Sequence, residues 1–143
     1  MSWDVLVINY YGSPPKDFAE VPVDHSPDPL GPAIDVREAI NKHLPGVDWS
    51  DRTWGFYEGD GFSIEFNAGK DDPIHTIMLH LRGGGDAIEA LLRFANPNKW
   101  SLLDCSTGDF IDPENPSYEG WDSFQEYRDK VVGNYDQDDN CSM

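Results

Sequence analysis

Three side chains in the middle of the sequence have the types and spacing to hold a small polar ligand. Glu65, His80 and Arg82 offer an acid, a titratable ring and a guanidinium. A strand is predicted from Ile74 to Leu81, and alternate residues of a strand share one face. His80 and Arg82 therefore lie together, facing away from the core. With Tyr57 and Glu65 of a preceding hairpin, they form a candidate ligand-binding set on the outer face of a sheet. The alternative is an ordinary polar face on which Glu65 and His80 pair across strands.

Other reactive patterns have structural interpretations. The Gly59-Asp60-Gly61 segment carries an acid where a phosphate loop would need donors or a cation. The Arg82-Gly-Gly-Gly-Asp86 segment places an Asp at the cap of a following helix, where it takes the place of an anion. Cys105 has no neighbouring cation to activate it and is predicted to be a buried structural cysteine. The sequence therefore predicts no catalytic residue, no metal site and no cofactor.

The amino-acid composition limits the kinds of molecule that this chain is expected to bind. The chain has 143 residues, 27 acids and 10 bases, which gives a net charge of −17. Such a chain is repelled by nucleic acid and by anionic membranes, and it favours a basic protein partner. No apolar run is long enough to cross a membrane and no signal peptide is evident, so a cytoplasmic protein is expected. The composition predicts one domain over residues 1–135 with a polar tail over 136–143, and it sets no oligomeric state.

The order of elements predicts an α+β fold. Apolar runs and caps indicate β-α-β-β-β-α-β-α, an antiparallel or mixed sheet of about five strands with helices mainly on one face. An extended Pro-rich loop is predicted over residues 12–32. Asp35 and Glu38 are expected to form a capping box at the start of the first helix. The remaining expected elements are a strand at 5–8, helices at 35–44 and from 86 to 96, a strand at 102–105, and a helix capped by Ser117.

The aromatic hairpin of residues 54–66 allows two registers. A two-residue turn would leave Trp54 and Phe56 on the outer face. A three-residue loop of residues 59–61 would instead bury both with the apolar residues of the second strand, and would turn Tyr57 outward. The second register separates apolar from polar side chains more cleanly, so it is the predicted one.

Several blocks of the sequence resemble those of a known group. They are WGxxxGDGFSIEF from Trp54 to Phe66, MLHLRGGGDA from Met78 to Ala87, and LDCSTGDF from Leu103 to Phe110, together with the opening Met1-Ser2-Trp3-Asp4. They resemble a widespread type of small bacterial protein of unassigned function, with immunity proteins as a class to consider. The resemblance implies a bacterial cytosolic protein and transfers no activity to any residue.

Two functions follow as hypotheses. The first is an immunity-type interaction protein that neutralises a basic bacterial toxin, for example a nuclease, through charge complementarity. The acids available for that interface are Glu58, Asp60, Asp71, Asp72, Asp109, Asp112, Glu114, Glu119 and Asp122. The second is a small-ligand binder or minor enzyme that uses the outer sheet face around Glu65, His80 and Arg82.

Overall fold

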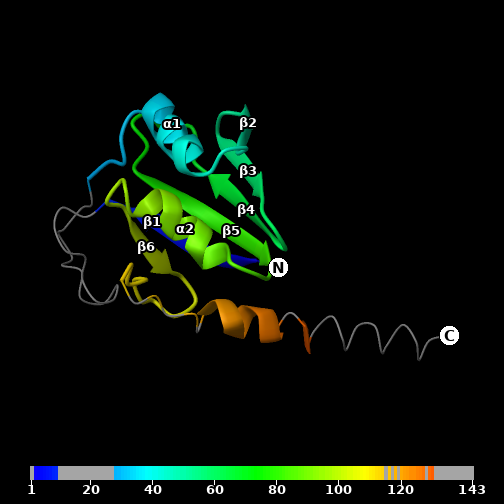
Figure 1. Cartoon of the computed structure of the whole chain (residues 1–143). Helices are drawn as coiled ribbons and strands as arrows, with labels where there is room; N and C mark the ends of the chain where they lie inside the picture. The colour runs from blue at the N-terminus through cyan, green and yellow to red at the C-terminus, as the bar shows by residue number, and fades with distance from the viewer. Residues whose placement is uncertain are drawn as a thin grey trace.

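The described part of the chain is built on one six-stranded sheet. The computed structural model describes residues 2–9, 28–114, 116, 118, 120–127 and 129–130. The strands are β1 (Trp3–Ile8), β2 (Asp48–Asp51), β3 (Trp54–Glu58), β4 (Phe62–Asn67), β5 (Thr76–Gly83) and β6 (Ser101–Asp104). Their order across the sheet is β2-β3-β4-β5-β1-β6, and every neighbouring pair is antiparallel (Figure 1). The predicted α+β class is confirmed, with six strands instead of about five.

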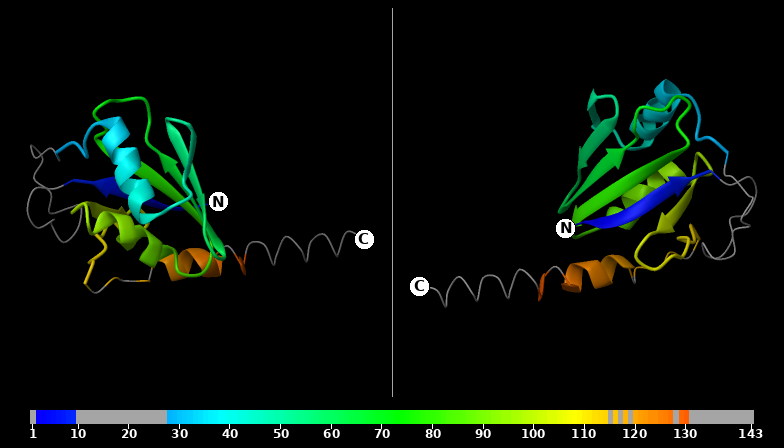
Figure 2. Two further views of the ribbon diagram at one scale, coloured as in Figure 1. Left: turned by 45° about the horizontal axis from the view of Figure 1, so that its top comes forward. Right: turned by 180° about the vertical axis from the view of Figure 1, so that it is seen from behind.

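The helices of the described residues pack against one face of this sheet. These are α1 (Ala33–His43), α2 (Ala87–Ala95) and a helical segment at residues 120–127. Figure 2 shows α1 and α2 on one side, and from behind it shows the strands uncovered. Trp121 of the third helical segment packs against Trp3, with ring centroids 5.4 Å apart. The predicted cap of that segment, Ser117, lies outside the described residues.

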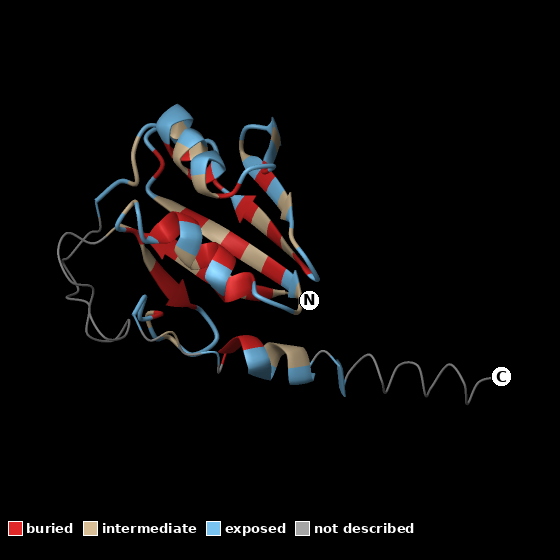
Figure 3. Cartoon of the chain, in the orientation of Figure 1, coloured by how far each residue is buried: buried red, intermediate tan, exposed pale blue. Residues whose placement is uncertain are grey.

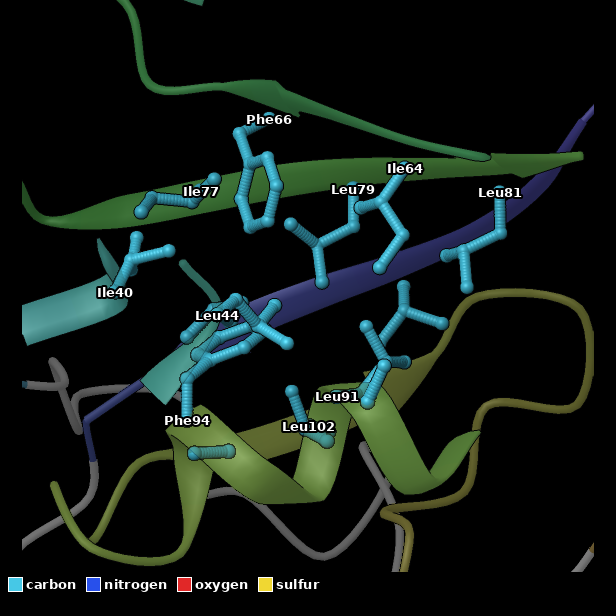
Figure 4. Packing of buried hydrophobic residues seen from close by; sticks show 14 of the residues in the cluster. Ile40, Leu44, Ile64, Phe66, Ile77, Leu79, Leu81, Leu91, Phe94 and Leu102 are labelled. Atoms are coloured by element: carbon cyan, nitrogen blue, oxygen red, sulfur yellow. The ribbon is translucent and has the colours of Figure 1, made fainter. Parts of the chain in front are cut away.

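The core fills the space between the helices and the sheet. Alternate strand residues are buried, as the banding of β4 and β5 in Figure 3 shows. Figure 4 shows Phe66, Ile77 and Leu79 of the sheet facing Ile40 of α1 and Phe94 of α2. All five are fully buried. Each such side chain contributes about 1.5–3 kcal/mol relative to an exposed one, so this layer holds the helices on one face.

The hairpin has the register that the sequence analysis set aside. The Gly59 N–H donates to the Phe62 carbonyl over 2.9 Å, and Tyr57 lies opposite Ile64. Asp60 and Gly61 therefore form a two-residue turn, and the prediction of a three-residue loop is wrong. As a consequence Tyr57 packs toward the core, not on the outer face.

A neighbouring strand explains the error. Gly55 lies on the buried side of β3, and a Cβ there would come within 2.8 Å of the Trp49 ring. Trp49, from β2, fills the space that Gly55 leaves and packs on Phe66 with ring centroids 5.7 Å apart. Alternation within the hairpin alone cannot reveal this, because the side chain that completes the buried face comes from another strand.

Three further predictions are corrected. Asp86 stands at the N-cap position of α2, but its side chain makes no capping hydrogen bond. The edge strand β2 was not predicted, because its polar sequence lacks the alternation of a half-buried strand. The capping box of Asp35 and Glu38 is wrong: α1 follows Pro32 without a side-chain cap from its own segment. Instead, the Ala33 N–H donates to Asp72 Oδ1 over 2.9 Å. Residues 12–27 of the predicted Pro-rich loop and the predicted tail at 136–143 lie outside the described residues.

Candidate functional site

The face of the sheet opposite the helices carries the candidate site. We call it the outer face. Within the described ranges no helix covers it (Figure 2, right). The strand registers place five residues in a row across it, namely Trp54, Asn67, Met78, Leu6 and Leu103. A parallel row consists of Phe56, Glu65, His80 and Asp4.

The charged groups at its centre pair with one another. Arg82 Nη1 donates to Glu65 Oε1 over 2.7 Å, and His80 Nδ1 lies 2.8 Å from Asp4 Oδ1. The predicted convergence of Glu65, His80 and Arg82 on the outer face is therefore confirmed. Glu65 lies directly opposite His80, yet each is bonded to another partner. Tyr57 is not part of this group, because its strand has the other register. The three convergent side chains are thus engaged within the chain itself.

Two aromatic side chains make the outer face unlike an ordinary polar surface. Trp54 is 37% exposed and Phe56 is 41% exposed. Trp54 stacks on the His80 ring with centroids 5.8 Å apart and planes inclined by 18°. In the sequence, the signal for this arrangement is Gly55, between the two aromatic residues. Because glycine has no side chain, it leaves space on the buried side of β3 for a side chain from another strand.

The outer face is closed at its β6 side by a small apolar cluster. Ile8 and Leu103 are buried there, with Leu6 and Phe110 packed against them. Phe110 belongs to a short segment that pairs with β6 through a bridge between Leu103 and Phe110. The open part of the outer face is therefore the region of β3, β4, β5 and β1.

The acids proposed for an interface do not form one patch. Asp60 and Asp122 come near the same end of the sheet, because the hairpin tip and the third helical segment both contact the Gly84–Gly85 link. The Gly84 N–H donates to the Gly61 carbonyl, and Trp121 Nε1 donates to the Gly85 carbonyl.

Glu58 lies near the same end, two residues before Asp60 on the hairpin. The other described acids lie elsewhere: Asp71 and Asp72 are in the loop between β4 and β5, and Asp109, Asp112 and Glu114 follow β6. All of these are exposed. Glu119 lies outside the described residues. A partner therefore cannot contact all the predicted acids on a single flat surface.

Asp104, the last residue of β6, has a structural role that the sequence did not predict. Asp104 of β6 is buried and accepts hydrogen bonds from Trp3 Nε1 over 3.0 Å and from the Ser106 hydroxyl over 2.6 Å. The next residue, Cys105, is exposed, so the prediction of a buried cysteine is wrong. The partial desolvation of its sulfur and the nearby carboxylates of Asp4 and Asp104 raise the pKa of the Cys105 thiol. This environment disfavours the reactive thiolate.

The described residues contain no group of three or more His, Cys, Asp or Glu side chains placed to hold a metal ion. Nor does any helix in that part of the chain have the length and apolarity needed to cross a membrane. Comparison of the chain with known protein families, with curated proteins and with solved structures finds no match. The resemblance to small bacterial proteins therefore stays a prediction.

Proposed function

We propose that this chain is a non-catalytic interaction protein of the immunity type. It acts in the cytoplasm, where it binds a basic bacterial toxin such as a nuclease and blocks it. The observation that carries the proposal is the pair of exposed aromatic side chains, Trp54 and Phe56, on a helix-free sheet face of a chain with a net charge of −17.

The aromatic pair supplies an anchor of the kind found in protein interfaces. Trp is enriched among the residues that dominate binding energy, and aromatic residues as a class are enriched at interfaces. Trp54 is held in place by its stack on His80, which in turn is held by Asp4. A fixed aromatic side chain loses little conformational entropy when a partner covers it, which favours affinity.

The net negative charge of the chain decides which kind of protein partner it attracts. Only two salt bridges occur among the described residues, His80–Asp4 and Arg82–Glu65. Because the chain has 27 acids and only 10 Lys or Arg residues, most of its acids have no basic side chain to pair with one to one. The resulting field attracts a basic protein and raises its association rate, an effect that weakens with salt.

The pairing on the outer face favours this function over a small-ligand site. A ligand that used Glu65 Oε1, His80 Nδ1 or Arg82 Nη1 would have to displace a partner already within 2.8 Å. Three hollows lined by described residues, of about 300–340 Å³ each, do not include Glu65, His80 or Arg82. A protein partner can cover the paired charges without separating them.

The test is affinity capture from a lysate of the native host at low and at moderate salt, followed by mass spectrometry. We expect one basic protein that is retained at low salt and reduced at moderate salt. The purified chain should then inhibit the activity of the captured protein, and co-expression should restore the growth of cells that produce it.

Either of two outcomes would contradict the proposal. Capture of no basic protein at low salt would remove the charge argument. Capture of a protein whose activity and toxicity the purified chain leaves unchanged would remove the immunity function.

A further inference from the structure

One hollow on the outer face brings apolar and polar side chains together with an acid that forms no ion pair. It has a volume of about 300 Å³. Its lining includes Leu6 of β1, Thr76 and Met78 of β5, and Asp71 and His75 of the loop between β4 and β5. It adjoins Asn67, the residue that pairs with Trp54 across β3 and β4. The hollow therefore opens beside the exposed aromatic side chain.

The two acids of the adjoining loop differ in what they do. Asp72 accepts a hydrogen bond from the Ala33 N–H and so caps α1. Asp71 is exposed and, within the described residues, forms no ion pair and accepts no hydrogen bond. The adjacent Lys70 does not neutralise it by an ion pair either. Asp71 thus lines a hollow with polar and apolar walls, and no ion pair or hydrogen bond of the described residues occupies its carboxylate.

These properties match one kind of side chain. Arg and Lys have an apolar stem that packs on apolar surface and a charged head that stays at the edge. Arg has, in addition, a planar guanidinium that binds a carboxylate through two parallel hydrogen bonds and stacks on aromatic rings. Leu6 and Met78 would contact the stem, Asp71 would accept from the head, and Trp54 lies one strand away to border it.

We propose that this hollow receives an arginine side chain of the basic partner, with Asp71 as the residue that recognises its charge. The inference rests on the proposed function for the identity of the partner as a basic protein. The hollow itself can be tested without that partner.

The test is an NMR titration of the ¹⁵N-labelled full chain with the capped tripeptide Gly-Arg-Gly. Matched peptides carry lysine, or citrulline, which has the shape of arginine without its charge. We expect the largest shifts at residues 67–71 and 75–78, with the arginine peptide binding more tightly than the lysine peptide. The citrulline peptide should bind about tenfold more weakly, because its hydrogen bond to Asp71 is no longer charge-assisted.

Substitution of Asp71 is the decisive part of this titration experiment. Asp71→Asn should weaken the arginine peptide by about tenfold and leave the citrulline peptide unchanged. The matched control Glu38→Gln removes an exposed acid of α1, on the other side of the sheet, and should change neither. Shifts centred on the hairpin tip and residue 122 instead, or equal binding of the arginine peptide by Asp71→Asn, would overturn the inference.

The failure of this inference is distinguishable from failure of the proposed function. Capture of a basic protein that Asp71→Asn binds as tightly as the wild-type chain keeps the function and refutes the hollow as its contact. Binding of the arginine peptide at the hollow, with no basic protein captured, supports the hollow and refutes the function.

Discussion

The substitution Gly55→Ala tests the arrangement that exposes Trp54 and Phe56. A Cβ at residue 55 would lie 2.8 Å from two ring atoms of Trp49, well inside van der Waals contact. The ring must then shift, which disturbs its packing on Phe66, where the ring centroids are 5.7 Å apart. Forcing an extra methyl into such a contact costs about 1–3 kcal/mol, and the disturbed aromatic pair adds about 0.5–1.5 kcal/mol.

A smaller gain opposes this cost. Alanine is more favourable than glycine within a strand by about 0.5–1 kcal/mol. The net expectation is a loss of about 2 kcal/mol in the free energy of unfolding. Urea unfolding followed by tryptophan fluorescence measures it, and the midpoint should fall by about 1 M if the slope is about 2 kcal/mol per M.

The stability of Gly55→Ala can also contradict the two-residue turn. In the register with a three-residue loop, Gly55 would face outward and alanine would leave stability unchanged or raise it. An unchanged or higher midpoint would therefore refute the two-residue turn and the exposure of both aromatic residues. As a control, Trp49→Ala removes the ring, so Gly55→Ala made in that background should cost nothing or stabilise slightly.

Three further predictions concern groups away from the outer face. Gly120→Ala should lower the free energy of unfolding by about 1–3 kcal/mol in a urea titration, because its Cβ would collide with the buried Asp104 carboxylate; unchanged stability would contradict that packing. Absorbance titration at alkaline pH should show Tyr118 ionising above its ordinary range, because its hydrogen bond to Glu89 is the main cause that raises the pKa of Tyr118. Glu89→Gln should bring that titration to lower pH, and an identical curve would show that the hydrogen bond has no effect. With the other cysteine replaced by serine, Cys105 should react with iodoacetamide at pH 8 more slowly than free cysteine does, because its pKa is raised. A faster rate would contradict the environment described for that thiol.

The order and class of the elements could be predicted because the signals are local. Helix α2 has an apolar stripe and ends before Asn96-Pro97, and β5 alternates in its burial. These patterns depend only on neighbouring residues. The cap of α1 could not be predicted in the same way, because Asp72 lies 39 residues from Ala33 in the sequence.

The same limit applies to the site. The convergence of Glu65, His80 and Arg82 follows from strand alternation, and the structure confirms it. Asp4 as the partner of His80 follows only from the pairing of β1 with β5, which no local pattern contains. The side on which Tyr57 lies depended on the hairpin register, and there the cleaner separation of apolar side chains was misleading.

The most direct test of the proposed interface compares the dissociation constants of two double variants for the captured basic protein. Trp54→Ala with Phe56→Ala removes both exposed aromatic side chains of the outer face. Ile34→Ala with Tyr127→Ala removes two side chains that are more exposed, at 59% and 61%, but lie on helical segments.

Thermal unfolding should first show that both double variants are folded. If the outer face binds the partner, the first should raise the dissociation constant by about 30-fold or more, the equivalent of about 2 kcal/mol for an interface anchor. The second should stay within about threefold of the wild-type value. Equal, small effects of the two variants would contradict the outer face as the binding surface.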